Sequence, residues 1–159
     1  MLTLLIYIML FKVNRKADQL KRAEKQSHHT FDVLDFWIDW FSETQEQIVS
    51  ASKPAVDMEQ LRQQLKHHRQ LNSEISTERQ SLRDMIADAA RVAREIGSTL
   101  EGQQAILMQK VDNARKLADD TAELSAERLA ELEQAFALCR ELDESYTELN
   151  DWMDGIFFV

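Results

Sequence analysis

Proline and glycine, the residues that most often interrupt a helix, occur at only four positions in this chain of 159 residues. These positions are Pro54, Gly97, Gly102 and Gly155. They leave three stretches, residues 12–53, 55–96 and 103–154, in which nothing forces a turn. At about 1.5 Å per residue, each stretch would form a helix roughly 60–80 Å long. We therefore predict three long helices, a pattern that favours a spacer or scaffold over a protein built around a pocket.

The composition agrees with long helices and argues against one class of partner. Charged residues make up 30% of the chain and aromatic residues only 8%, which is typical of long helices and coiled coils. The net charge of −9 argues against nucleic-acid binding, because phosphate contacts require a basic surface. The single cysteine, Cys139, cannot form a disulfide within the chain, which suits a reducing, intracellular setting.

The third stretch has a heptad pattern whose phase never slips. Alternating steps of three and four residues from Leu107 to Ile156 reach fifteen positions, of which twelve are apolar. The positions are Leu107, Val111, Ala114, Ala118, Thr121, Ser125, Arg128, Leu132, Ala135, Cys139, Leu142, Tyr146, Leu149, Met153 and Ile156. A sustained period of about 3.5 residues predicts that this face, here called the seam, is buried along one continuous helix of a left-handed bundle or coiled coil. The polar residues Thr121, Ser125 and Arg128 are expected to bury little, which weakens the case for a dimeric coiled coil.

The second stretch repeats the helical spacing. Its apolar and seam positions are Leu61, Leu65, His68, Leu71, Ile75, Leu82, Ile86, Ala89, Ala93 and Ile96. Asp57 with Gln60, and Ser98 with Glu101, resemble capping boxes, and we predict that they start the second and third helices.

The first stretch has a wider apolar face, which must contact more than one partner helix. This face comprises Phe31, Val33, Leu34, Trp37, Ile38, Trp40, Phe41, Thr44 and Ile48. Two short reversals would then fold the chain into an all-α three-helix bundle with Trp40 buried in its core. We expect a monomer, with a parallel homodimeric coiled coil as the structural alternative.

A weak internal repeat pairs the beginning of the chain with its end. The identities after a shift of 112 residues are Leu20 with Leu132, Ala23 with Ala135, Asp39 with Asp151, and Trp40 with Trp152. A repeat of this period predicts that each helical unit restarts where the previous one ends.

Three segments of the chain resemble the spectrin repeat. They are FWIDWFSETQEQI at 36–48, DMEQLRQQLKHHRQLNSEI at 57–75 and LSAERLAELEQAFAL at 124–138. The second has the family's Gln-x-x-x-His-x-x-Leu-x-x-Glu-Ile texture, at Gln64, His68, Leu71, Glu74 and Ile75. Many members have a second tryptophan where this chain has Ala118, which predicts a less tightly packed core.

The resemblance implies one complete repeat at residues 31–137, the end of a preceding repeat at 14–30 and the start of a following one at 138–159. The runs Trp-Phe-Ser-Glu-Thr and His-His-Arg-Gln-Leu are most similar to the rods of spectraplakins, of the dystonin or microtubule–actin crosslinking factor type. Nesprins, dystrophin and spectrin remain open. The implied function is a structural rod segment of a cytoplasmic, cytoskeletal crosslinker, which provides length, elasticity and a docking surface for proteins. The implied partners are adjacent repeats, and actin, microtubules or intermediate filaments bound through other parts of the parent chain.

The first thirteen residues, MLTLLIYIMLFKV, differ from the rest. The apolar run is about half the length of a membrane span, and neither a basic region before it nor a cleavage site after it indicates a signal peptide. We interpret residues 1–13 as a non-native or stray apolar segment, with a membrane anchor as the alternative, and expect no membrane partner. The last residues, 155–159, are also apolar, so the chain looks like a piece of a longer protein.

No pattern in the chain predicts catalysis, and we expect no catalytic, cofactor or metal residues. His28–His29 and His67–His68 are adjacent, so the two rings of each pair would point about 100° apart on a helix and could not share a metal ion. We expect one seam histidine and one solvated histidine in each pair. There is no glycine-rich phosphate loop and no nucleophile motif, and Cys139 is expected to be a small core residue. The acidic residues Asp119, Asp120, Glu123, Glu127, Glu131 and Glu133 are expected on a solvated face.

We therefore predict a protein that is not an enzyme and binds no small-molecule substrate. Two alternatives to a structural rod segment remain. One is a helical module that binds a partner protein through an exposed apolar patch around Trp37 or Phe41. The other is a nesprin-like, membrane-tethered coiled-coil scaffold anchored by residues 1–11.

Overall fold

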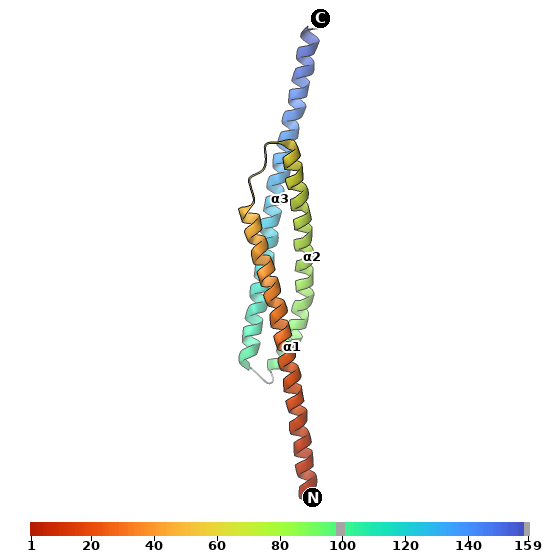
Figure 1. The fold of residues 1–159 in the computed structure, drawn as a ribbon, viewed down its shortest axis with the longest axis vertical. Coiled ribbons are helices and arrows are strands. Elements are labelled where there is room, and N and C mark those ends of the chain that lie inside the picture. The colour runs from red at the N-terminus through yellow and green to blue at the C-terminus, as the bar shows by residue number, and fades with distance from the viewer. Residues whose placement is uncertain (98–100, 158–159) are drawn as a thin grey trace. The chain divides into compact units, whose positions relative to one another are not determined.

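The computed structural model describes residues 1–97 and 101–157, and their regular secondary structure is entirely helical (Figure 1). Helix α1 spans Leu2–Ser50, α2 spans Met58–Gly97 and α3 spans Glu101–Phe157. The prediction of an all-α fold with three long helices packed as a bundle is confirmed. The left-handed winding stays a prediction.

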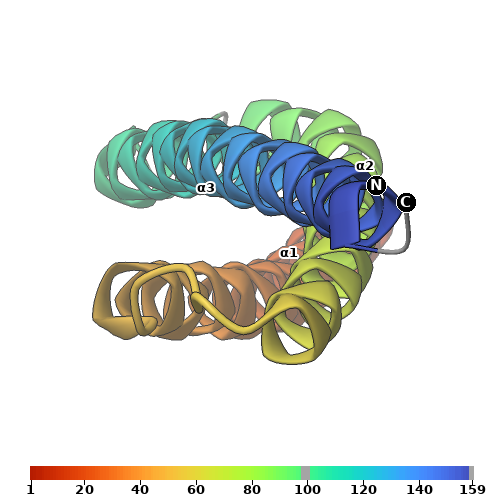
Figure 2. The same cartoon turned by 90° about the horizontal axis from the view of Figure 1, so that it is seen from above.

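The connection between α1 and α2 lies where proline predicted it. Pro54 lies among the non-helical residues that separate Ser50 from Met58 (Figure 2). The backbone N–H of Gln60 donates to Oδ1 of Asp57 at 2.9 Å, so Asp57 caps the start of α2 as expected. The predicted cap at Ser98 lies outside the described residues.

We expected every glycine to interrupt a helix, but two of them do not. Gly102 and Gly155 both lie inside α3, close to its ends. A single glycine costs a helix only about 1 kcal/mol relative to alanine, too little to end one by itself. At the other end of the chain, the apolar run that precedes Lys12 is part of α1.

The chain divides into two compact units, each of which contains a segment of all three helices. Unit 1 consists of Met1–Ser42 and Arg79–Ala118, and unit 2 consists of Glu43–Glu78 and Asp119–Val159.

The core of unit 1 is mostly apolar, with Ser27 and Thr30 as buried polar members, and it receives side chains from all three helices. Its buried members are Leu34 and Phe41 from α1, Leu82, Ala89, Val92, Ala93 and Ile96 from α2, and Leu107, Val111, Ala114 and Ala118 from α3. At its surface, Nζ of Lys110 on α3 lies 2.6 Å from Oδ2 of Asp35 on α1. The same ammonium group lies 5.3 Å from the ring centroid of Phe31, within the range of a cation–π contact.

The core of unit 2 has an apolar cluster and several buried polar side chains. Leu61 and Leu65 of α2 form a cluster with Leu132 of α3. The residues packed against it are Ala55, Leu129, Ala135, Phe136 and Cys139. Thr44, His68, Thr121 and Ser125 are also buried in this unit.

We predicted from the sequence that Trp40 is buried in the core, and this prediction is wrong. Trp40 is half-buried, whereas the neighbouring Phe41 is fully buried, and their rings make an edge-on contact with centroids 4.9 Å apart. Adjacent residues on a helix point about 100° apart, so the two rings cannot both point straight into the core. Burial of Phe41 also removes it from the surface patch that a binding module would need, although Phe36 remains 60% exposed.

Candidate functional site

The heptad seam of α3 is buried only along part of its length. Its positions from Leu107 to Leu132 are buried, apart from Arg128, which is partly buried. We expected Thr121 and Ser125 to bury little, but both are fully buried. Ala118, where the family often has tryptophan, is also buried. Small side chains therefore occupy the buried middle of the seam, and the less tightly packed core stays a prediction.

Beyond Cys139 the seam continues but is uncovered. We call residues 140–157 the C-terminal arm, and each of them is exposed. The exposed seam positions of this arm are Leu142, Tyr146, Leu149, Met153 and Ile156. Leu142 is 71% exposed, whereas Leu132, on the same seam of the same helix, is 2% exposed. A regular apolar stripe exposed over this length indicates a surface that another helix can cover.

In helix α1 the order is reversed, because its seam is exposed near the N-terminus and buried farther along the helix. Its buried seam positions are Ser27, Thr30, Leu34, Phe41, Thr44 and Ile48. Continued toward the N-terminus in the same heptad phase, the seam positions are Ala23, Leu20, Lys16, Val13, Met9 and Ile6, all of which are exposed except the partly buried Ala23. We call residues 1–26 the N-terminal arm. The two arms are the chain's candidate binding surfaces.

A groove lies beside the N-terminal arm in unit 1. It has a volume of about 570 Å³ and is lined by Lys16, Gln19, Leu20, Arg22, Ala23, Gln26 and Glu95. Two of the lining residues, Leu20 and Ala23, are apolar, and the other five are polar or charged. An apolar stripe with a charged rim suits an amphipathic helix.

A buried polar layer in unit 2 joins α2 to α3. Nε2 of His68 lies 2.8 Å from the backbone carbonyl oxygen of Ser125, which can only accept, so Nε2–H donates. The hydroxyl of Ser125 donates to Oδ1 of Asn72 at 3.0 Å. No buried polar side-chain atom among the described residues lacks a partner. Because buried polar groups are costly unless paired, this layer favours one alignment of α2 against α3.

The nearness of a serine to a histidine does not make a catalytic site here. The 3.3 Å between Oγ of Ser125 and Nε2 of His68 resembles a nucleophile–base pair. However, Nε2 uses its proton on the carbonyl oxygen and has no free lone pair to accept one from Ser125. Ser125 is also fully buried, so no substrate could reach its hydroxyl.

The histidine pairs are placed partly as predicted. His68 is buried on the seam and His67 is exposed, as expected. His28 and His29 are both exposed, which is a correction, because the adjacent seam positions are Ser27 and Thr30. Across the parts of the chain that the structure describes, no three His, Cys, Asp or Glu side chains gather to hold a metal ion. The acidic residues predicted to be solvated, from Asp119 to Glu133, are exposed.

Two polar side chains hold the connection between α1 and α2. Gln64 accepts from the backbone N–H of Ala55 at 2.9 Å and donates to the carbonyl oxygen of Lys53 at 3.2 Å. The guanidinium of Arg128 donates to the carbonyl oxygen of Ser52 and to Glu131. Gln64 is part of the spectrin-repeat pattern described above, but the periodicity of the sequence did not predict that Arg128 would bind this connection.

We expect Arg128→Met to lower the free energy of unfolding by about 1.5–3 kcal/mol, because hydrogen bonds to charged groups contribute this much. Methionine keeps the apolar stem of a side chain that is only 11% exposed, while removing its donors. Urea unfolding followed by circular dichroism measures the change. The control is Arg115→Met, whose side chain is 56% exposed and pairs with Asp112 one helical turn away. Equal losses in the two variants would contradict a role for Arg128 at the connection.

The fold and surfaces place the chain among all-α helical bundle proteins with exposed heptad seams. In sequence, it is similar to microtubule-actin cross-linking factor 1. It is 21% identical to human isoforms 6/7 over 142 residues, which is 89% of this chain and 4% of the relative. It is 22% identical to mouse isoforms 6/7 over the same length, again 89% of this chain and 4% of the relative. For the rat protein the identity is 22% over 142 residues, which is 89% of this chain and 3% of the relative.

These matches concern a small part of very long proteins, since the chain spans only 2–4% of the length of these relatives. No protein-family model matches the chain. No solved structure matches it. The similarity is thus distant, but it extends over most of the chain.

Proposed function

We propose that this chain is a structural rod segment of a cytoskeletal crosslinking protein, built as a spectrin-like repeat with parts of its two neighbours. The exposed seam of the C-terminal arm supports this proposal most strongly. It continues the buried seam of α3 in the same heptad phase and on the same unbroken helix, so it is already shaped for a following bundle. The part of the N-terminal arm from Val13 to Gln26 would complete a preceding bundle in the same way.

The distant relatives support the same class. Their names state that they cross-link microtubules and actin. For this chain we propose a spectraplakin-type parent in the cytoplasm, with nesprin, dystrophin and spectrin types as less favoured parents. Filament binding would belong to other regions of that parent. The segment would provide length, elasticity and a docking surface, and would catalyse no reaction.

The mechanical role follows from the continuity of α3. A helix that passes from one bundle into the next resists bending more than a Gly/Ser-rich linker, which behaves as a flexible coil. Unfolding of one bundle would also remove a partner from the next, so neighbouring bundles would share stability, as in other repeat proteins.

The internal period allows a direct test. Because 112 is a whole number of heptads, residue 145 of one copy can be joined to residue 34 of a second copy without changing the seam phase. The proposal predicts that this tandem protein unfolds in one cooperative transition, with a midpoint above that of the single chain. Two independent transitions at the single-chain midpoint would overturn it. Calorimetry distinguishes the two results.

Replacing Arg140 of the first copy by proline in that tandem protein should separate the two bundles. Proline inside a helix removes a backbone hydrogen bond and clashes with the preceding turn, at a cost of about 3 kcal/mol or more. Arg140 is exposed and pairs only locally, with Glu144, so the substitution would act mainly through the backbone. Arg140→Ala is the matched control and should leave the single transition intact. Unchanged cooperativity of unfolding in the proline variant would contradict a continuous helical junction.

A further inference from the structure

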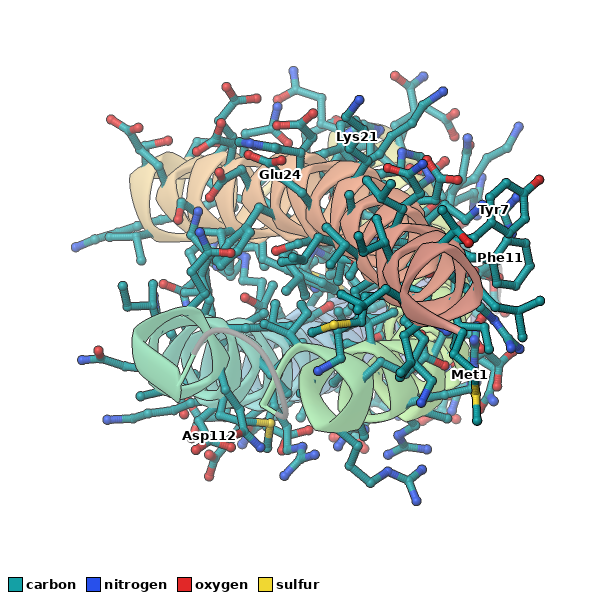
Figure 3. All side chains as sticks on the ribbon, turned by 90° about the horizontal axis from the view of Figure 1, so that it is seen from below. Met1, Tyr7, Phe11, Lys21, Glu24 and Asp112 are labelled. Atoms are coloured by element: carbon teal, nitrogen blue, oxygen red, sulfur yellow. The ribbon has the colours of Figure 1, made fainter. Side chains whose placement is uncertain are left out.

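The beginning of the N-terminal arm is apolar on every side. Residues 1–11 lie in or beside α1, and all of them are exposed. Their large apolar side chains range from 45% exposure at Ile8 to 102% at Met1. Figure 3 shows Tyr7 and Phe11 projecting outward from the helix. A partner helix covers only one stripe, so this all-round apolar surface is not explained by a bundle contact.

A basic segment follows immediately. Residues 12–25 contain six basic and two acidic residues, for a net charge of +4. The basic residues are Lys12, Arg15, Lys16, Lys21, Arg22 and Lys25. The remainder of the chain has thirteen basic and twenty-six acidic residues, for a net charge of −13. The arm is therefore strongly basic in a chain that is otherwise acidic.

We propose that the N-terminal arm binds the surface of an anionic lipid bilayer, with residues 2–11 in the apolar region and Lys12, Arg15 and Lys16 at the lipid phosphates. Lipid chains can surround a helix on all sides, and basic residues next to an apolar segment attract anionic headgroups. The acidic remainder of the chain would be repelled from the same surface, which orients the arm toward it.

The proposed contact does not require a membrane span. Eleven helical residues extend about 16 Å, roughly half of the hydrocarbon thickness of a bilayer. Among the residues that the structure describes, no helix has the length and apolarity that crossing a membrane requires. We expected no membrane partner from the sequence because the run is too short to cross, but a peripheral contact does not need that length.

A second copy of the chain is the strongest competing occupant. The C-terminal arm, residues 140–157, has six acidic residues and one basic residue, so it complements the charge of residues 12–25. Pairing of the two arms would cover the seam at Val13 and Leu20. It would leave the other sides of residues 1–11 in water, which is why the observations favour lipid.

Flotation of the full-length chain with lipid vesicles tests the proposal. We expect binding to vesicles of mixed phosphatidylcholine and phosphatidylserine, and weak binding to phosphatidylcholine alone. The variant Lys12→Glu/Arg15→Glu/Lys16→Glu should bind at least on the order of 100-fold more weakly, because each basic residue at an anionic surface contributes about five-fold. The variant Leu5→Gln/Ile8→Gln should also lose binding. Both sets of positions are exposed, and an unchanged melting temperature confirms that each variant folds.

The matched control makes the same charge change away from the arm. Lys53, Lys66 and Lys116 are exposed, and their combined replacement by glutamate should leave vesicle binding in place. No flotation of the unmodified chain, equal binding to neutral vesicles, or an equal loss in the control would each overturn the proposal. Sedimentation without lipid completes the test. Arm-dependent self-association with no vesicle binding would assign the surface to a second copy and overturn the lipid assignment.

Discussion

Replacing Phe41 by alanine is expected to lower the free energy of unfolding by about 3–5 kcal/mol, the loss typical of a fully buried aromatic side chain. Phe41 is fully buried in unit 1, where side chains from all three helices are packed. The loss combines the transfer of the ring to water with the cavity that its removal leaves. A loss of this size is a large fraction of the stability of an ordinary domain.

Two neighbouring aromatic residues are the controls for this experiment. Phe36→Ala removes the same side chain from a site that is 60% exposed, and we expect a loss within about 0.5 kcal/mol. Trp40→Ala should give an intermediate loss, because Trp40 is half-buried and its ring contacts that of Phe41. Urea unfolding of the three variants gives the ranking. A greater loss for Trp40→Ala than for Phe41→Ala would contradict the described core and favour the burial of Trp40 that we expected from the sequence.

Leu132→Ala should lower the free energy of unfolding by about 2–5 kcal/mol. Leu132 is 2% exposed and forms the apolar cluster of unit 2 with Leu61 and Leu65. Because protein interiors are close-packed and relax only partly around a truncated side chain, the substitution leaves a cavity in the cluster.

Leu142→Ala is the matched comparison, because Leu142 lies on the same seam of the same helix but is 71% exposed. We expect a change within about 0.5 kcal/mol in the single chain. In the tandem protein, Leu142 of the first copy becomes part of the second bundle, and its truncation should cost more. A large loss for Leu142→Ala in the single chain, at a concentration where the chain is monomeric, would contradict the exposed C-terminal arm.

The helices themselves were largely predictable. Long runs without proline or glycine, the cap at Asp57 and the heptad phase of α3 are local properties, and the structure has helices at each of these places. The predicted helix ends were wrong where a single glycine was the only signal, because the helical preference of the surrounding residues outweighs it. Gly102 and Gly155 interrupt nothing, since helical residues flank both of them.

The burial of individual side chains was less predictable. Thr121 and Ser125 looked like a thin part of the seam, but both are fully buried, and the hydroxyl of Ser125 donates to Asn72. Arg128 also occupies a seam position, where its stem packs while its guanidinium reaches Ser52. Periodicity assigns a face to each residue, but it does not state how close the next helix comes or which backbone group a long side chain can reach.

The sequence by itself determined that this chain forms three helices, that each has an apolar face, and that the seam of the third keeps a single heptad phase. These properties depend on contacts within a few residues and on the order of apolar and polar side chains. Only the tertiary structure decided where along each seam the burial ends, that Phe41 rather than Trp40 is enclosed, and that His68 reaches the carbonyl oxygen of Ser125. Those outcomes depend on which helices lie side by side at each level, and that is set by contacts between residues far apart in the chain.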